Sequence, residues 1–313
     1  MFIFVINCGS SSVKAKLFKA NSHTNEICSA KVEAIGLPRC TLSFSSKEKS
    51  LTGPLNCKNH TEAIENILHG LQNHNVLNNL KEIILVGHRV VHGGENYTNP
   101  TIITKTVLKT IDSLSLLAPL HNPVNIKGIE AAQTFLPHAT NIAVFDTAFH
   151  HTIPKEAFLY GLPLEFYEKQ GIRKYGFHGI STKYVSEKAR QLSPNLSELI
   201  VCHLGNGSSI TAVKDGNSIE TSMGYSPLDG IIMGSRSGEL DPEVVLHILR
   251  QGTYTVDTLT ELLNKKSGLF GISAVSTDIR DLKEAADNGN KRAELALNML
   301  AHRIALFIGS YMP

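Results

Sequence analysis

The chain has 313 residues, of which 42% are hydrophobic and 19% are charged, and its formal net charge is +2. This is the composition of an ordinary soluble globular protein, and the length suffices for two domains of roughly 100–200 residues each. A net charge so close to zero argues for neither nucleic acid nor membrane as a partner, whereas small anionic substrates need only local positive charge. No segment approaches the ~18 apolar residues of a membrane span.

The chain starts with a short apolar stretch, residues 1–6, that has no basic flank and stops at Asn7. It is too short for a secretion signal and is expected to be a buried first strand. The cysteines are odd in number and lack metal-like spacing; they are Cys8, Cys28, Cys40, Cys57 and Cys202. We interpret them as reduced thiols, which predicts a cytoplasmic protein.

The first half of the chain reads as an α/β domain over residues 1–150. Strands are expected as a hairpin over 2–18 and at 27–34, 41–44, 83–87 and 142–145. Asn59 and Glu62 have capping-box spacing and predict a helix start, and a second helix is expected from Pro123 to residue 136. In the hairpin, Lys14 alternates with apolar residues and should lie on the outer face of its strand.

Two charged residues follow apolar strands in this half. Arg89 precedes a double glycine, Gly93-Gly94, which is how an α/β sheet often presents a site at its carboxyl edge. Asp146 ends the strand 142–145, where a carboxylate can hold a hydrated Mg²⁺ or orient a nucleophile. From the residues alone, a helix or turn cap explains Asp146 equally well.

The second half, residues 151–313, is organised around the stretch 200–242. An apolar strand at 199–202 is followed by a small-residue turn at 205–209, a second strand at 210–213 and a hairpin turn at Asp215-Gly216. Glycine amides and serine hydroxyls in such a turn suit a phosphate group, although any β-turn also favours these residues. Arg236 lies between small residues on both sides, which favours contact with a phosphoryl group over simple solvation.

The remaining elements of this half are mostly helical. His178 lies between glycines and opens a helix that Ser181 is expected to cap, and further helices are expected at 242–252, 256–264 and 291–311. A histidine in such a loop is about as often structural as catalytic. Asp278 has the spacing of a helix cap.

The turn Gly9-Ser10-Ser11 echoes Gly207-Ser208-Ser209, which suggests two related domains facing one nucleotide phosphate tail. Eight motifs occur in order along the chain: NCGSSSVK, GHRVVHGGE, LAPLHNP, VFDTAFH, YGFHG, HLGNGSS, SPLDGIIMGSRSGELDP and STDIRD. Together they resemble the acetate kinase family of the acetate and sugar kinase, Hsp70 and actin superfamily. The resemblance implies two actin-like (ribonuclease H-like) α/β domains.

The resemblance also implies roles for individual residues. Catalysis would rest on Asp146, His178, Arg236 and Arg89, with Asn7 beside Mg²⁺ (or Mn²⁺). Arg89, Val91, Leu120, His121, Phe177 and Pro227 would contact the acyl substrate. The nucleotide contacts would be Ser10, Ser12, Lys14, His203, Leu204, Gly205, Asn206, Gly207, Asp278, Ile279 and Arg280.

The implied reaction is ATP plus acetate giving ADP and acetyl phosphate by direct in-line transfer, in a homodimer. Propionate or butyrate kinase differs only in a pocket volume that the sequence does not measure. The motifs that follow the last helix in the family are not found in the chain, so the second domain is expected to be incomplete at its C-terminus. An inactive fragment that acts at most as a binding or dimerising partner is therefore the alternative hypothesis.

Overall fold

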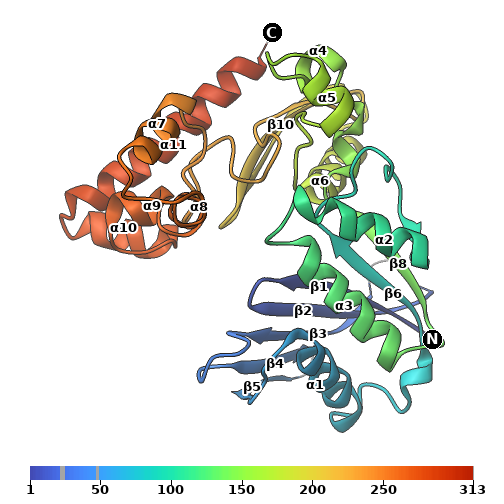
Figure 1. The fold of residues 1–313 in the computed structure, drawn as a ribbon. Coiled ribbons are helices and arrows are strands. Elements are labelled where there is room, and N and C mark those ends of the chain that lie inside the picture. Colours follow the sequence, from blue (N-terminus) through green and yellow to red (C-terminus); the bar gives the residue numbers. More distant parts are fainter. Residues whose placement is uncertain (22–24, 47–48, 313) are drawn as a thin grey trace. The chain divides into compact units, whose positions relative to one another are not determined.

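The computed structural model describes residues 1–21, 25–46 and 49–312, and the chain divides into two compact units, Met1–Ala148 and Phe149–Pro313 (Figure 1). Each unit has its own β-sheet. Within the described residues, none of the helices combines the length and the hydropathy needed to span a bilayer.

The first unit is built on an eight-stranded mixed sheet with the order β5-β4-β3-β2-β1-β6-β8-β7. The strands are β1 (Phe2–Gly9), β2 (Ser12–Lys19), β3 (Glu26–Glu33), β4 (Thr41–Ser46), β5 (Ser50–Pro54), β6 (Ile83–Val90), β7 (Thr101–Ile102) and β8 (Thr140–Phe145). The first five strands form an antiparallel meander, whereas β1, β6 and β8 run parallel. The carboxyl ends of these three parallel strands therefore meet at one edge of the sheet.

The β1–β2 hairpin confirms the strands expected over 2–18. Val13, Ala15 and Leu17 are buried while Lys14 and Lys16 are exposed, as the period of two requires. Strands β5 and β7 were not predicted, because β5 carries little apolar character and β7 is only two residues long.

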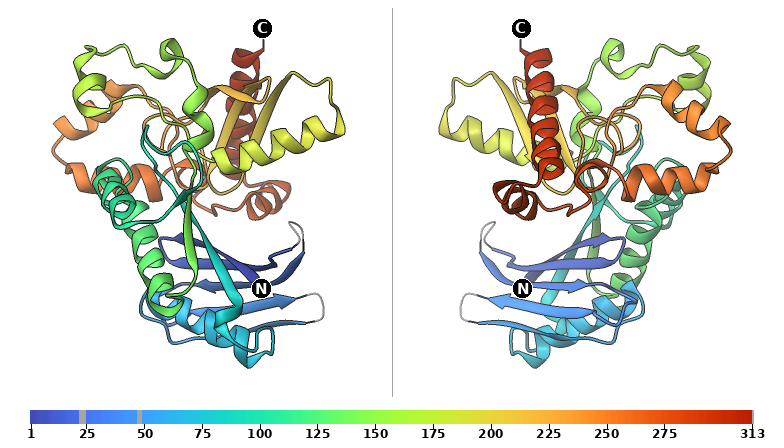
Figure 2. Two further views of the ribbon diagram at one scale, coloured as in Figure 1. Left: turned by 90° about the vertical axis from the view of Figure 1, so that its right-hand side faces the viewer. Right: turned by 90° about the vertical axis from the view of Figure 1, so that its left-hand side faces the viewer.

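The helices of this unit are α1 (His60–Asn73), α2 (Lys105–Ser113) and α3 (Asn122–Phe135), with the short 3₁₀ turns η1 (Leu80–Glu82) and η2 (Leu114–Leu116). A third 3₁₀ turn, η3 (Ala148–Thr152), spans the boundary in the sequence between the first unit and the second. Helices α1 and α3 pack on the same face of the sheet (Figures 1 and 2). Gly128 brings α3 close to β1, because a Cβ at this position would collide with the Cys8 sulfur.

The expected capping box at the start of α1 forms only in part. The Asn59 side chain accepts a hydrogen bond from the Glu62 N–H at 2.9 Å, which makes Asn59 the N-cap. The Glu62 carboxylate, however, accepts from the N–H of Lys58 at 2.8 Å rather than from that of Asn59. In a full capping box Glu62 would bind the backbone N–H of the N-cap residue itself, and here it binds that of the preceding residue.

The second unit is built on a three-stranded antiparallel sheet with the order β11-β10-β9. Its strands are β9 (Glu198–Leu204), β10 (Ser208–Lys214) and β11 (Asn217–Thr221). The Asp215-Gly216 turn joins β10 to β11, and both residues have positive φ, as tight hairpin turns require. The predicted turn 205–209 is too long, because Ser208 and Ser209 already belong to β10 and only 205–207 lie between the strands.

Strand β10 is buried on both faces. Ile210 packs in a cluster with residues of α9, α10 and α11, which include Leu269, Leu282 and Leu300. Ser209 points to the opposite face and lies against the start of α6. One strand therefore connects the apolar core of this unit with a polar region.

The helices of the second unit are α4 (Lys155–Phe158), α5 (Glu165–Gln170), α6 (Gly179–Leu192), α7 (Pro242–Arg250), α8 (Val256–Lys265), α9 (Gly268–Ser273), α10 (Ile279–Asp287) and α11 (Lys291–Tyr311). The expected long last helix is confirmed. The expected Ser181 cap is wrong: His178 occupies the N-cap position of α6, and the Ser181 hydroxyl contacts another side chain.

Candidate active site

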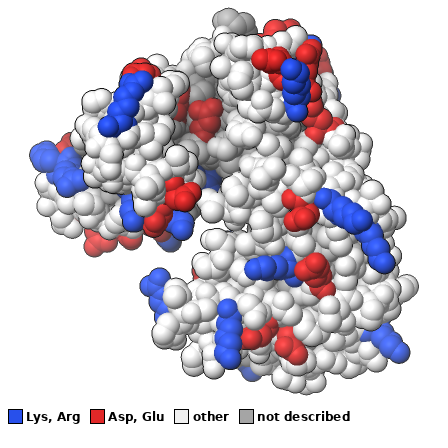
Figure 3. All heavy atoms as spheres, in the orientation of Figure 1, with Lys and Arg blue, Asp and Glu red and all other residues white. Residues whose placement is uncertain are grey.

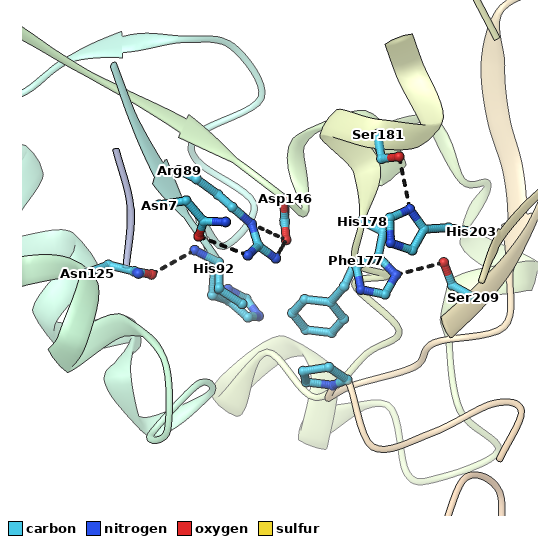
Figure 4. Close-up of polar contacts among 12 residues, drawn as sticks. Asn7, Arg89, His92, Asn125, Asp146, Phe177, His178, Ser181, His203 and Ser209 are labelled. Carbon is cyan, nitrogen blue, oxygen red and sulfur yellow. Dashed lines mark hydrogen bonds and ion pairs between the residues drawn. The ribbon is translucent and has the colours of Figure 1, made fainter. Parts of the chain in front are cut away.

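Three polar side chains meet at the carboxyl edge of the first sheet. Arg89 on β6 donates from Nε to the Asp146 carboxylate at 3.0 Å, and its Nη2 forms an ion pair with the same oxygen (Figure 4). The Nη1 of Arg89 donates to Asn7 Oδ1 on β1 at 3.1 Å. The structure thus brings together three of the predicted site residues.

Asp146 is largely withdrawn from water, with only 2% of its surface exposed, whereas Arg89 is half-buried. Burial alone would lower the pKa of Arg89, but the Asp146 carboxylate outweighs it and raises the pKa above the ordinary value. Arg89 therefore stays cationic, and the buried carboxylate keeps a counter-charge. Such a paired arginine can exchange part of its hydrogen bonding for a bound carboxylate or phosphoryl oxygen.

The predicted phosphate contacts of the first unit lie on the β1–β2 hairpin. Lys14 is the cross-strand partner of Asn7, so the two side chains share one face of the sheet. Ser10 and Lys14 are exposed and Ser12 is half-buried, which leaves the hairpin tip accessible to a ligand.

The segment after β6 is held by two buried asparagines that the sequence analysis did not single out. Asn125 accepts from the Val91 N–H at 3.0 Å and donates to the Cys8 carbonyl, while Asn122 accepts from the His92 N–H at 3.1 Å. Both belong to α3, and a three-residue spacing of asparagines on the buried face of a helix is the signal that could have identified them. They tie the ends of β1 and β6 to one helix.

The predicted acyl contacts of this unit differ in exposure. Val91 is buried, Leu120 is exposed, and His121 is the half-buried residue that precedes α3.

Two buried histidines of the first unit make its stability depend on pH. Burial lowers the pKa of His88, which bonds Asn141, and that of His92 to about 4. Because the unfolded rings bind protons near pH 6.5, the free energy of unfolding should fall as the pH drops from about 6.5 towards 4. Urea unfolding across this range measures how steeply the free energy of unfolding changes with pH. In His88→Gln this slope should be smaller than in the wild type by up to about 1.4 kcal/mol per pH unit. An unchanged slope would mean that His88 is not buried neutral in the folded state.

The second unit places two histidines side by side. The rings of His178 and His203 stack with centroids 4.2 Å apart (Figure 4). His178 Nδ1 is 3.0 Å from the Ser209 hydroxyl, and His203 Nδ1 is 2.9 Å from the Ser181 hydroxyl. Each ring is therefore oriented through Nδ1 by a serine, and neither serine partnership was predicted from the sequence.

Arg236 and His178 converge on the glycine turn between β9 and β10. A Cβ placed on Gly207 would lie 3.4 Å from His178 Nε2 and 3.5 Å from Arg236 Nη1. The same Nη1 donates to the Pro227 carbonyl at 3.1 Å, which orients the guanidinium. The absence of a side chain at Gly207 thus leaves room beside two nitrogen-bearing groups, as an anionic group requires.

The loop that carries Arg236 is fixed on both sides. The Ser237 N–H donates to the Leu263 carbonyl at the end of α8, and the Ser235 carbonyl accepts from the Ser267 N–H, each at 3.0 Å. Arg236 therefore projects from a rigid segment, so its guanidinium can be held in place before a ligand arrives.

A cavity of about 360 Å³ opens beside the same turn. It joins the turn to the start of α10, and its lining includes Leu204, Gly205, Asn206, Asp278, Ile279 and Arg280. Asp278 is the N-cap of α10, and its hydrogen bonds with Arg280 lower its pKa to about 2. The structure thus gathers six of the predicted nucleotide contacts around one cavity, while His203 and Gly207 lie outside its lining.

Oxygen donors suited to Mg²⁺ are present in the first unit. Asp146 and Asn7 supply a carboxylate and an amide oxygen, and Mg²⁺ in such sites commonly takes one or two protein oxygens together with water and substrate phosphates. Among the described residues no cluster of three or more His, Cys, Asp or Glu side chains could hold a metal by itself. The donor set therefore fits an ion that arrives with a phosphate ligand.

Charges of both signs are interspersed over the face seen in Figure 3. Neither sign of charge dominates this face, in keeping with the formal net charge of +2.

The chain matches the model of the acetokinase family over residues 2–313. It is 51% identical to an acetate kinase of Desulfitobacterium hafniense (strain DSM 10664 / DCB-2), over 99% of the chain and 79% of that protein. It is 49% identical to an acetate kinase of Geobacillus sp. (strain WCH70), over 99% of the chain and 78% of that protein. The chain thus spans about four fifths of the length of these relatives.

Solved structures with the same fold include a propionate kinase from Francisella tularensis subsp. tularensis SCHU S4, with a TM-score of 0.94, 42% identity and coverage of 99% of this chain and 80% of that one. An acetate kinase from Porphyromonas gingivalis has a TM-score of 0.90 at 39% identity, with coverage of 99% and 79%. These neighbours confirm the expected actin-like α/β fold.

Proposed function

Because the chain belongs to the acetokinase family, we propose that it transfers the γ-phosphoryl group of ATP to acetate and forms acetyl phosphate and ADP. The observation that carries the proposal is the convergence of Arg236 and His178 over Gly207 in the β9–β10 turn. A transferring phosphoryl group spreads its charge over three oxygens, and catalysis of its transfer rests on positioning and charge neutralisation.

In the second unit, Arg236 and His178 would bind the oxygens of the transferring phosphoryl group. Ser209 orients His178 through Nδ1, which directs Nε2 to the same space as the guanidinium of Arg236. In the transition state the phosphoryl group is only partly bonded to the acetate oxygen that attacks and to the ADP oxygen that leaves. The two groups would stabilise the negative charge of the phosphoryl oxygens at that point.

The nucleotide would use the remaining parts of the β9–β10 turn and the adjoining cavity. A volume of about 360 Å³ is within the range of small-molecule sites, and its mixed lining suits an adenosine. His203 and Gly207 would contact the phosphates, and so would Lys14, Ser10 and Ser12 of the first unit.

In the first unit, Arg89 would bind the acetate carboxylate or the phosphoryl group, and the Asp146 carboxylate would contribute to catalysis by keeping that guanidinium in place. Asn7 and Asp146 would hold Mg²⁺ (or Mn²⁺), which neutralises phosphate charge when bound. Acetate itself is a weak nucleophile with little for a protein to activate, so the task of these residues is alignment.

The residues proposed to contact the acyl group are Val91, Leu120 and His121 in the first unit and Phe177 and Pro227 in the second. Replacing Val91 by alanine should shift preference towards propionate or butyrate, because it removes apolar volume from a buried position. One methylene of pocket space is worth about 1–3 kcal/mol, so the ratios of kcat/KM should move by about 10- to 200-fold at most. Ratios for the three acids that equal those of the wild type would remove Val91 from the pocket.

The likeness to a propionate kinase makes propionate the second candidate substrate. The proposal is tested by incubating the purified chain with Mg·ATP and each acid, and by trapping the acyl phosphate with hydroxylamine. Acetyl phosphate formed with the highest kcat/KM supports acetate kinase activity, whereas a higher value for propionate would reassign the substrate. ADP release that does not depend on any acid would refute acyl transfer.

We further propose that the protein works in the cytoplasm as a homodimer. Five free thiols, four of them buried, suit a reducing compartment. Sedimentation of the purified chain at several concentrations measures the assembly, and a mass of one chain throughout would refute the dimer.

A further inference from the structure

A buried histidine outside the proposed catalytic set contacts the backbone that carries His178. His150 is 1% exposed and has a partner at each ring nitrogen. Its Nδ1 is 2.9 Å from the Ser218 hydroxyl on β11, and its Nε2 is 2.9 Å from the Phe177 carbonyl. All of these residues belong to the second unit.

The partners determine the tautomer of the neutral ring. A carbonyl oxygen can only accept, so Nε2 must carry the proton and donate it to Phe177. Nδ1 is then unprotonated and accepts from the Ser218 hydroxyl. The Phe177 carbonyl thus sets the tautomer, and the Ser218 hydroxyl, which can donate or accept, satisfies Nδ1 in that form.

This carbonyl belongs to the peptide that joins Phe177 to His178, where the chain adopts an unusual conformation. His178 has φ +60°, a left-handed value that costs a non-glycine residue about 1–2 kcal/mol. Gly176 has φ +72°, and a Cβ there would lie 2.8 Å from the His150 ring. The His150 ring thus packs against the segment 176–178 and donates to the Phe177 carbonyl within it. Contacts of this kind hold a strained backbone segment in one conformation.

We propose that His150, with Ser218 behind it, is a positioning residue for His178. The hydrogen bond from His150 fixes the Phe177–His178 peptide, and this peptide sets the direction in which the His178 ring leaves the backbone. The inference rests on the proposed function, in which His178 contacts the phosphoryl group. His150 acts through His178 and does not itself touch the substrate.

The first test compares kcat in variants of His150. Phenylalanine in place of His150 fills the space without a donor and should lower kcat by about 10- to 100-fold, since a displacement of ~1 Å can cost that much. Glutamine, whose amide nitrogen can take the place of Nε2, should restore kcat to within about threefold of the wild type. The exposed His247→Gln on α7 is the matched control and should leave kcat unchanged.

The second test asks whether the effect passes through His178. In a His178→Ala background, His150→Phe should cost less than about twofold, because the group that it positions is already gone. The same loss of kcat in both backgrounds, or no loss in the wild-type background, would overturn the proposal. Should His150→Phe fail to fold, Ser218→Ala serves instead, and it should lower kcat by a smaller factor that also vanishes without His178.

A third measurement does not depend on activity. Nitrogen NMR of the histidine rings should find one ring with Nε2 protonated and Nδ1 bare, and the signals of this ring should be absent from the spectrum of His150→Gln. A proton on Nδ1 in the wild type would overturn the positioning role even if the kinase is active. Absence of acetyl phosphate from the wild type with the expected tautomer present would instead refute the proposed function.

Discussion

Replacement of Arg236 by alanine is expected to lower kcat for acetyl phosphate formation by about 10³-fold or more, because arginines that stabilise phosphoryl transfer have effects of this size. KM for acetate and for ATP should change far less, since the charge that Arg236 meets develops mainly in the transition state. The loop should keep its shape, because its anchors to Leu263 and Ser267 are backbone hydrogen bonds. Initial rates at saturating ATP and acetate measure the effect.

Lysine at position 236 is the matched control. It keeps the positive charge but lacks the planar group that can donate to the Pro227 carbonyl and to a phosphoryl oxygen at the same time. The kcat of Arg236→Lys should therefore lie between that of Arg236→Ala and that of the wild type. A loss of less than about tenfold for Arg236→Ala, equivalent to about 1.4 kcal/mol, would remove Arg236 from the catalytic role.

The second large effect is expected at Arg89, where alanine should reduce both activity and stability. The change leaves the Asp146 carboxylate buried without its cation, and breaking a buried pair in this way typically costs about 3–5 kcal/mol. Activity should fall as well, because the acyl substrate or phosphoryl group loses its cationic partner. Urea unfolding and initial rates of the same preparation separate the two effects.

Asp146→Asn is the variant to compare with Arg89→Ala. It leaves an unpaired charge on Arg89, which is the more exposed residue of the pair. The Arg89 side chain is 34% exposed and that of Asp146 only 3%, so the loss of stability should be smaller than for Arg89→Ala. Lys16→Ala breaks an exposed pair with Glu26 and should cost about 1 kcal/mol or less. Equal losses for Arg89→Ala and Lys16→Ala would contradict the view that Asp146 depends on Arg89.

The parts of the fold that the sequence predicts are those with a strong repeating pattern. The alternation in β2 and the stripe of α11 each bury one face against a core, so periodicity alone locates them. Strand β7 and helix α9 escape prediction because they are short, with two and six residues, and owe their conformation to tertiary contacts.

The candidate site follows the same division. Arg89, Asp146 and Arg236 stand out because charge next to an apolar strand or among glycines is unusual. The residues that orient them do not stand out, since Asn125, Ser209 and Ser181 are common polar residues whose partners lie far away in the chain. Only the folded backbone brings these pairs to hydrogen-bond distance, and for that reason Ser181 was mistaken for a cap.

Strand β10 limits how this protein can tolerate insertions and deletions. Adjacent residues of the strand serve opposite faces, with Ser209 on His178 and Ile210 in the apolar cluster. Loss of one residue before Ser209 would turn the hydroxyl into the core and the isoleucine towards the imidazole, because a shift by one exchanges the two faces of a strand. In a library of single-codon deletions selected for activity, variants that lack one residue of 208–213 should therefore be lost, even at positions where substitutions are tolerated. Each such deletion should impair both folding and catalysis.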